Sequence, residues 1–301
     1  MSARTLPIRT DPIGGEAIDS WLEAAAHRTH TSFGDLLTAV GLNPFSGVGT
    51  PTWVVCLNPS DAATIGAATG VGADVLTTMT LQHYSDRALC IKSEDRSLSR
   101  AFPWGPGRGS RFCPGCLDDA GGRWQLRWRL GWTFACTTHN CLLADACPDC
   151  GAVQRVRTHI GETIPQPGRC SRPARDATGR TPRRCGTFLT AAAAPSFDAD
   201  HPVIHAQKVV NAVIDSETVA FGAYETCPQP RLKVLSDLRA VAGRVLAYAS
   251  IEDLKDVVPH DLHRLYRKVG ESPGSRAGPA QTETSLGWLH RHGRRRPLSE
   301  W

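Results

Sequence analysis

The sequence predicts a mainly α-helical protein with small β elements in a cysteine-rich middle region, and three observations lead to this fold class. Apolar residues recur at helical spacing towards both ends of the chain, for example in residues 17–26 and 231–249. Six of the eleven cysteines and one histidine fall within residues 112–151. Proline and glycine are dense in residues 103–111, where we expect a domain boundary.

The composition is that of an ordinary globular protein. The 301 residues suffice for two or three domains, and the hydrophobic and charged fractions of 41% and 21% are typical. The sequence has no run of 18 apolar residues, and its N-terminus lacks the apolar region of a secretory signal. We therefore expect a cytoplasmic protein of bacterial type without a membrane span. In that reducing compartment the cysteines are metal ligands or free thiols rather than disulfides.

Two short amphipathic helices are predicted in residues 17–26 and 34–41. Their apolar side chains fall on one face of each helix: Ile18, Trp21, Leu22 and Ala25 in the first, and Leu36, Leu37 and Val40 in the second, which Gly41 ends. Packing of both helices on a common core is the favoured interpretation.

Residues 60–81 fit a helix-turn-helix motif that begins with Ser60 as the N-cap. With Ala62 as the first position, the buried positions of the motif are Ile65, Val71, Leu76 and Met79, with the small Gly66 at the helix crossing and Gly70 in the turn. The second helix carries Asp74 outward and has no Lys or Arg, although a helix in the DNA major groove normally has phosphate contacts beside it. A packing or protein-contact unit is therefore favoured over direct DNA contact.

A first zinc site is predicted from Cys113, Cys116, Cys136 and His139. The two pairs have the spacing of zinc knuckles, because two residues between ligands let a tight turn aim both side chains at one ion. Cys141 could replace His139 as a ligand. Since Cys136 and His139 have the tighter spacing, we interpret Cys141 as a small buried residue.

A second zinc site is predicted from Cys147, Cys150, Cys170 and Cys185. The last two cysteines enclose 14 residues of loop-like sequence, a closure that is tolerable because its entropic cost grows slowly with length. Protein side chains would complete the coordination of both ions. We therefore expect two structural zinc ions per chain, without an open position for water.

Three tryptophans lie between the two ligand pairs of the first site. Trp124, Trp128 and Trp132 recur at every fourth residue, which would stack them along one helical face. Core packing is favoured over ligand binding, because aromatic rings dominate burial energetics. Arg127 and Arg129 would then point elsewhere, where they could meet phosphate or a carboxylate partner.

The positive charge of the chain is concentrated in this middle region. The net charge is −5 in residues 1–86, +9 in residues 87–190 and +1 in residues 191–301. Two zinc–thiolate centres would reduce the middle value to about +6. A polyanionic partner, DNA or RNA, is therefore plausible.

The remainder of the chain is predicted to be helical as far as residue 270. Helices are expected at 202–216, 231–249 and 259–269, and Ser250 with Asp253 resembles a capping box. The predicted division is an N-terminal helical domain (1–105), tandem zinc modules (106–190), a C-terminal helical domain (191–270) entered through a linker at 191–196, and a disordered basic tail (271–301).

Sequence motifs of common enzymes are absent. There is no phosphate-binding loop, no nucleophile elbow and no H-E-x-x-H helix, and the zinc-deaminase order of motifs is missing. A zinc enzyme acting on nucleic acid is disfavoured, because no open metal position or acid–base pair can be named. We therefore expect a protein that is not an enzyme.

The ordered combination of motifs resembles the TniQ family. The matching pieces are L-P-I-R and G-G-E-A-I-D-S-W-L near the N-terminus, A-T-G-V-G-A-D-V-L-T-T-M-T-L, F-C-P-G-C-L, W-R-L-G-W-T-F-A-C-T-T-H-N-C-L-L and C-P-D-C-G. The resemblance covers about residues 5–190. Two features depart from the pattern: Ala17 stands where the family has Ser after Gly-Glu, and Cys170 and Cys185 are widely spaced.

TniQ proteins are transposition accessory factors related to the target-selecting TnsD proteins. The resemblance implies a helix-turn-helix domain followed by zinc-ribbon-like modules. It also implies a link between a target, which is a DNA site or an RNA-guided complex, and an AAA+ ATPase regulator (TniB or TnsC) that recruits the transposase. Nucleoid association and a homodimer are both compatible with this role.

The favoured hypothesis is a non-catalytic adaptor for transposon target selection. Its nucleic-acid or partner contacts are expected from arginines of the middle region, namely Arg111, Arg127, Arg129, Arg183 and Arg184. The alternative is a stand-alone zinc and helix-turn-helix transcription regulator, which would require sequence-specific duplex binding by this chain alone.

Overall fold

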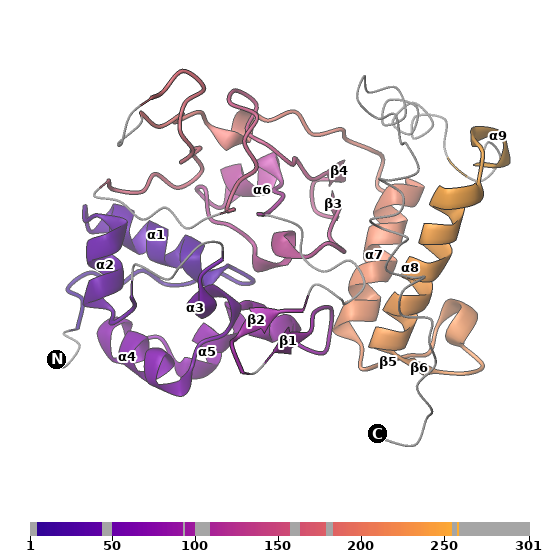
Figure 1. The fold of residues 1–301 in the computed structure, drawn as a ribbon, viewed down its shortest axis with the longest axis horizontal. Coiled ribbons are helices and arrows are strands. Elements are labelled where there is room, and N and C mark those ends of the chain that lie inside the picture. Colours follow the sequence, from indigo (N-terminus) through magenta and orange to yellow (C-terminus); the bar gives the residue numbers. More distant parts are fainter. Residues whose placement is uncertain are drawn as a thin grey trace. The chain divides into compact units, whose positions relative to one another are not determined.

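The computed structural model describes residues 5–43, 50–92, 94–99, 109–156, 163–178, 183–254 and 258. Contacts divide the chain into two compact units, Met1–Val241 and Ala242–Trp301. Figure 1 follows the chain through these units, and most of its regular structure is helical.

The N-terminal part of the first unit contains five short helices around one hydrophobic core. The helices are α1 (Ile18–Arg28), α2 (Phe33–Ala39), α3 (Thr52–Val55), α4 (Pro59–Thr69) and α5 (Ala73–Thr78). The two predicted amphipathic helices correspond to α1 and α2, and their apolar faces meet in this core. Trp21 and Phe33 are among its largest fully buried side chains.

Helices α4 and α5 lie where the helix-turn-helix motif was predicted. The apolar positions of that prediction are in the core: Ile65, Leu76 and Met79 are buried, and Val71 packs against them. Gly70 ends α4 with a left-handed φ of 79°, a conformation that glycine adopts without strain. The predicted N-cap, Ser60, was wrong by two residues: Asn58 caps α4 by accepting the N–H of Asp61, because Pro59 occupies the first helical position.

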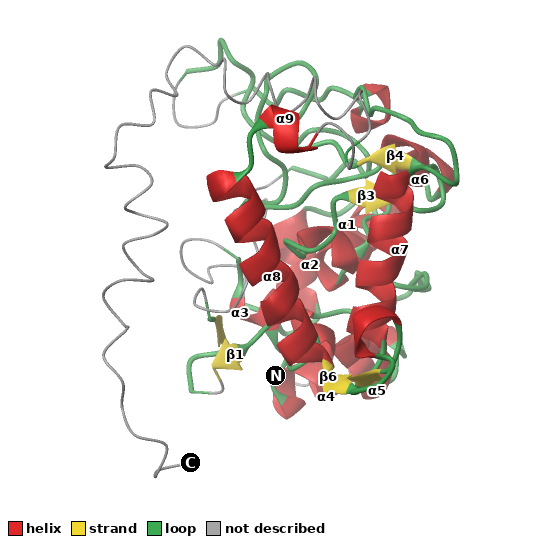
Figure 2. Cartoon of the chain, turned by 90° about the vertical axis from the view of Figure 1, so that its right-hand side faces the viewer, coloured by secondary structure: helices red, strands yellow, loops and turns green. Residues whose placement is uncertain are grey.

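A second hydrophobic core joins the chain around residues 81–132 to the helices after residue 200. It contains Trp132 and, from α7 (Pro202–Asp215) and α8 (Arg231–Tyr248), the side chains of Val213 and Leu235. Two hairpins border it, β1 (Ile91–Lys92) with β2 (Ser97–Leu98) and β5 (Thr218–Val219) with β6 (Gln229–Pro230). Figure 2 shows α7 beside the first turns of α8.

The tryptophan-bearing segment forms no extended helix, contrary to the prediction. Its only helical element is the 3-10 turn η2 (Leu126–Arg129). The backbone before that turn pairs with another segment instead: Ala17 donates its N–H to Trp124, and Leu126 donates its N–H to Gly15. These long-range bonds use groups that an α-helix would pair internally.

The second unit is described for residues 242–254 and 258, which comprise the end of α8 and the short helix α9 (Ile251–Leu254). Ser250 and Asp253 form the predicted capping box: the Asp253 N–H donates to the Ser250 hydroxyl, and the Ser250 N–H donates to the Asp253 carboxylate. The helix predicted at 259–269 and the tail from 271 lie outside the described residues. Among the helices that the structure describes, none has the length and apolar character to cross a membrane.

Candidate metal centres

The first four predicted ligands come together from a short helix and a hairpin. Cys113 is the N-cap of α6 (Pro114–Asp119), and Cys116 lies in its first turn. Cys136 ends β3 (Ala135–Cys136), and His139 lies in the turn that leads to β4 (Cys141–Leu142). The helix start and the hairpin turn each present two ligands, as the C-x2-C and C-x2-H spacing requires.

The ligand atoms of this first cluster face one another. His139 Nδ1 lies 3.3 Å from Cys116 Sγ and 3.6 Å from Cys113 Sγ, and the four ligand atoms all lie within 4.8 Å of one another. Backbone N–H groups of Cys116 and His139 point at the sulfurs of Cys113 and Cys136, at 3.5 and 3.4 Å. Three sulfurs and one imidazole nitrogen so arranged fit a tetrahedral ion.

The thiols of the first cluster influence one another strongly. Hydrogen bonds from Cys113 and Cys116 hold the pKa of Cys136 well below its ordinary value, whereas the hydrogen bond to Cys113 raises the pKa of Cys116. The three sulfurs are therefore close enough for the charge on one to depend on the others.

Cys141 lies beside this cluster but not within the four-ligand group. It is buried, its sulfur lies 3.7 Å from Cys113 Sγ, and burial raises the pKa of its thiol to about 12. In the hairpin it pairs with Cys136. Its position agrees with the interpretation of Cys141 as a small buried residue.

The second predicted ligand set also comes together. The sulfurs of Cys147 and Cys185 lie 3.8 Å apart, those of Cys150 and Cys170 lie 3.6 Å apart, and all four lie within 4.8 Å of one another. The side chain of Gln154 donates to Cys170 Sγ at 3.4 Å, a contact that was not foreseen from the sequence. Four cysteine sulfurs with a polar outer contact fit a structural zinc site.

All three tryptophans are buried, as predicted for core residues, but only Trp124 and Trp128 pack with the cysteines. Trp124 and Trp128 meet edge to face with ring centroids 5.6 Å apart, and both belong to the hydrophobic cluster that includes the cysteines. Trp132 belongs instead to the second core. The rings therefore serve two different cores and do not form a single stripe.

Helix α1 is attached to the cysteine-rich region through buried ion pairs. Asp19 is 2% exposed, and its Oδ2 lies 2.5 Å from Arg129 Nη2 and 2.6 Å from Arg155 Nη1. Arg155 also pairs with Glu23 at 2.7 Å and places its guanidinium over the Trp124 ring, 4.6 Å from the centroid. Arg155 lies five residues after Cys150 of the second four-cysteine cluster, so this ionic cluster connects α1 to that cluster.

A second contact between α1 and the cysteine-rich region lies one turn earlier. The carboxylate of Glu16 is fully buried and accepts from both Arg123, at 2.5 Å, and the Ser20 hydroxyl, at 2.9 Å. Ser20 in turn accepts the backbone N–H of Trp124. The sequence did not indicate this interface, although Asp19, Ser20 and Glu23 form a polar stripe beside the apolar face of α1, with Glu16 just before the helix.

Helix α7 is attached to the β3–β4 hairpin through a buried glutamine. The Oε1 of Gln207 accepts the N–H groups of Phe134 and Ala135, at 2.8 and 3.0 Å, and the side chain is fully buried. The segment predicted as a linker also pairs with this hairpin, because Leu142 donates its N–H to Pro195 at 2.8 Å.

The five arginines proposed as contact residues lie in different environments. Arg129 is 5% exposed and bound to Asp19, so its predicted place on the outer surface was wrong; the acidic face of α1 neutralises it inside the protein. Arg111 is held by Asp145 at 2.9 Å and by the carbonyl of Thr133 at 3.0 Å. Arg127 faces Asp215 at 3.8 Å and is 34% exposed.

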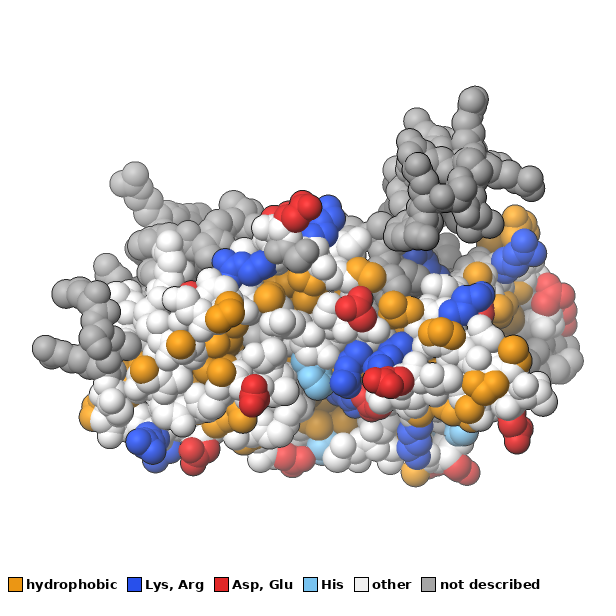
Figure 3. Space-filling model, turned by 90° about the horizontal axis from the view of Figure 1, so that it is seen from below, with side chains coloured by type: hydrophobic (Ala, Val, Ile, Leu, Met, Phe, Trp, Pro, Cys, Tyr) orange, Lys and Arg blue, Asp and Glu red, His pale blue; other side chains and the backbone are white. Residues whose placement is uncertain are grey.

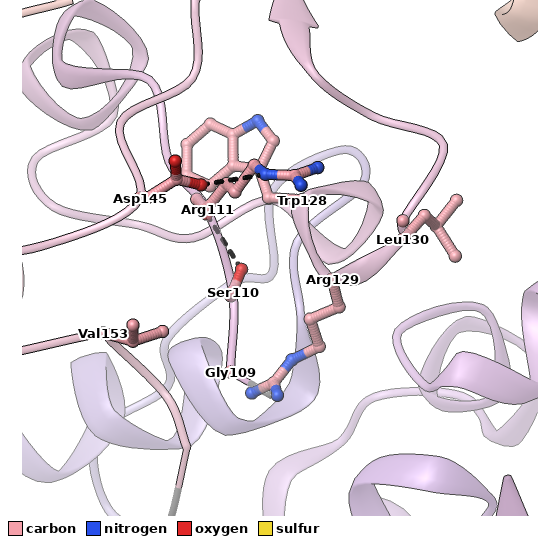
Figure 4. A pocket seen from close by; sticks show the side chains of 9 residues that line it. Gly109, Ser110, Arg111, Trp128, Arg129, Leu130, Asp145 and Val153 are labelled. Carbon is pink, nitrogen blue, oxygen red and sulfur yellow. Dashed lines mark hydrogen bonds and ion pairs between the residues drawn. The ribbon is translucent and has the colours of Figure 1, made fainter. Parts of the chain in front are cut away.

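Arg111 and Arg129 both line a cavity of about 210 Å³, which Figure 4 shows from close by. Trp128 and Asp145 line the same cavity. Figure 4 draws the ion pair between Arg111 and Asp145 as a dashed line, so Arg111 already has a partner within the chain.

Arg183 and Arg184 lie on the loop of the second centre and are exposed. Arg183 pairs with Asp176 at 3.0 Å, with both side chains mostly in solvent, and Arg184 donates to the carbonyl of Ser171 at 3.1 Å. These weak surface contacts leave both guanidinium groups accessible.

Comparison with known proteins identifies the N-terminal part of the chain. The family model TniQ matches residues 7–143, from the segment before α1 to the residue after β4, and this range includes the whole first cluster. The search of curated proteins found no match. Residues 7–143 therefore carry a TniQ region, which supports a TniQ-family protein with a transposition-associated accessory role.

Proposed function

We propose that the chain is a non-catalytic adaptor in transposition, which links a nucleic-acid target to an AAA+ ATPase regulator and through it to the transposase. The observation that carries the proposal is the pair of four-ligand clusters, the first of which lies within the TniQ region. Each cluster offers a full tetrahedral set of ligands, so neither keeps a position for a reacting water. Such centres stabilise a fold and supply no chemistry of their own.

Zinc is the ion that these ligand sets favour. Three thiols with one imidazole, and four thiols, are the usual donor sets of structural zinc, and the small antiparallel hairpin β3–β4 is typical of such modules. Bound zinc would hold the start of α6 and the hairpin together. It would thereby fix the arginines that bind α1.

The loop of the second centre is the best candidate for contact with nucleic acid. It exposes Arg175, Arg183 and Arg184. Next to it, Phe188 is 53% exposed, and the Arg169 guanidinium lies 3.7 Å from its ring centroid. Accessible arginines supply phosphate contacts, and an exposed aromatic ring offers a stacking surface for an unpaired base. A target that is held open by an RNA-guided complex would suit this combination.

The surface of helices α4 and α5 is better suited to a protein partner. Helix α5 exposes Asp74, Val75 and Thr78 and has neither Lys nor Arg. Figure 3 shows one face of the molecule, on which the basic side chains of the described residues are interspersed with acidic and apolar ones. This mixed surface supports contact with the ATPase and argues against the alternative of a stand-alone regulator that reads duplex DNA through α5.

Capture of the partner tests the proposal. The chain, loaded with zinc, is immobilised and mixed with a TniB- or TnsC-like AAA+ ATPase from the same genome, in the presence of nucleotide and DNA. We expect retention of the ATPase, and an unrelated AAA+ ATPase serves as the control. If this TniB- or TnsC-like ATPase is not retained while the chain alone binds one duplex sequence selectively, the transcription-regulator alternative is correct.

A further inference from the structure

The imidazole of His139 has a specific contact on each of its two nitrogens. Nδ1 faces the three sulfurs of the first cluster, at 3.3 Å from Cys116, 3.6 Å from Cys113 and 3.7 Å from Cys136. Nε2 lies 3.1 Å from the carboxylate of Asp119, the last residue of α6. The ring thus lies between the ligand cluster and a carboxylate.

Gly115 leaves the space that this ring position needs. A Cβ at residue 115 would lie 2.5 Å from His139 Cδ2 and 2.7 Å from Nε2, closer than real side chains approach. The start of α6 therefore supplies two ligands and a surface for the ring. The last residue of the helix, Asp119, supplies the carboxylate that meets Nε2.

A competing ligand lies close to the same cluster. Cys141 Sγ is 3.7 Å from Cys113 Sγ, and a thiolate binds zinc at least as readily as an imidazole does. Something must therefore favour His139 over Cys141 as the fourth ligand.

We infer that Asp119 is the positioning residue that makes this choice, an inference that rests on the proposed binding of a metal ion. Its carboxylate accepts the Nε2–H of His139, which fixes the neutral tautomer whose lone pair is on Nδ1 and aims that lone pair at the ion. A metal-bound histidine commonly donates its other N–H to a carboxylate, and loss of that partner lowers metal affinity about 10- to 100-fold. Because the Asp119 side chain is 68% exposed and water competes for the hydrogen bond, we expect an effect of about tenfold.

Metal affinity and histidine spectroscopy on the whole chain test this role. Zn²⁺ dissociation constants are measured by chelator competition for wild type, Asp119→Ala and Asp119→Asn, with Asp118→Ala as the matched control on the same exposed end of α6. We expect Asp119→Ala to weaken one site about tenfold. The Zn²⁺ affinity of Asp119→Asn should fall between those of wild type and Asp119→Ala, because the amide oxygen of asparagine still accepts the Nε2–H of His139. The affinity of Asp118→Ala should match that of wild type. Long-range ¹H–¹⁵N spectra should show a Zn-bound Nδ1 and a protonated Nε2 on His139 in wild type.

Cobalt substitution reports on the competing thiol. With Co²⁺ in place of zinc, Asp119→Ala should increase the thiolate-to-cobalt absorption as Cys141 replaces His139, and the double variant with Cys141→Ser should lose the increase. Wild type that binds two ions, together with an Asp119→Ala variant of unchanged affinity and absorption, overturns the role of Asp119 and leaves the metal centres intact. A wild-type chain that binds no ion overturns both proposals.

Discussion

The substitution Asp19→Asn tests whether buried ion pairs hold α1 on the cysteine-rich region. Asparagine preserves the shape of the side chain and removes its charge. Arg129 and Arg155, whose side chains are 5% and 11% exposed, would then keep only Glu23 as a carboxylate partner. The change therefore isolates the charge of Asp19 from its packing.

The expected loss of stability is large. Removing one partner of a buried ion pair costs about 3–5 kcal/mol, because the remaining charge stays buried without compensation. An exposed pair contributes less than about 1 kcal/mol. The pair of Arg183 with Asp176, in which the side chains are 68% and 76% exposed, is the matched control through Asp176→Asn.

Urea unfolding of the zinc-saturated chain is the assay, followed by circular dichroism and tryptophan fluorescence. With a denaturant dependence of about 2–3 kcal/mol per molar, Asp19→Asn should lower the midpoint by about 1–2 M, and Asp176→Asn should leave it nearly unchanged. A loss below about 1 kcal/mol for Asp19→Asn would refute the claim that this cluster is desolvated and structural.

The pH dependence gives an independent check on Asp19. Burial alone would raise the pKa of Asp19, but the guanidinium groups of Arg129 and Arg155 hold that pKa below its ordinary value of 3.8. The carboxylate therefore contributes its full stabilisation above pH 3.8 and loses it as the pH falls through the folded pKa. The difference in unfolding free energy between wild type and Asp19→Asn should be constant from about pH 5 to 8 and shrink only in stronger acid.

Three further predictions concern backbone packing, a buried amide and the exposed arginines. Gly122→Ala places a Cβ 2.3 Å from the backbone of a neighbouring loop at a left-handed φ, so it should lower the unfolding free energy by more than about 3 kcal/mol. Gly121 also has a left-handed φ but open space around it, so Gly121→Ala should lower the unfolding free energy by about 1–2 kcal/mol. Equal losses for the two variants in urea would contradict the close approach at Gly122. Gln207→Ala removes the acceptor of one buried N–H group, that of Ala135, and of one partly buried N–H group, that of Phe134. It should lower the unfolding free energy by about 2–5 kcal/mol in the same assay, and a loss under about 1 kcal/mol would mean that water replaces the amide. The double variant Arg183→Glu with Arg184→Glu should bind DNA more weakly, with no change in its urea midpoint. The slope of log affinity against log salt concentration should become shallower by about 1–2, and an unchanged slope would exclude this loop from the interface.

Local patterns in the sequence were sufficient to predict the metal-ligand clusters and most helices. The spacing of Cys113 with Cys116 reflects a single turn, and the apolar periodicity of residues 17–26 reflects a single helical face, so neither depends on distant residues. Burial of Trp124 was likewise predictable from its size and apolar surface.

Long-range partners were not predictable in the same way. Asp19 and Arg155 are 136 residues apart, and nothing local to either indicates that they meet. For the same reason Arg129 was expected on the surface, because an arginine is buried only where a distant carboxylate compensates its charge. The four-residue spacing of the tryptophans had favoured a helix. The structure has no such helix there, because the backbone of this segment forms hydrogen bonds with residues 15–17 instead.

The number of metal ions bound by the purified chain is the most direct test of the two four-ligand clusters on which the proposed adaptor function depends. Metal analysis of wild type should give two zinc ions per chain, as the two four-ligand clusters predict. Cys116→Ser and Cys150→Ser should each give one ion, because each disables one cluster. One ion or none in the wild-type chain would contradict the tandem structural centres.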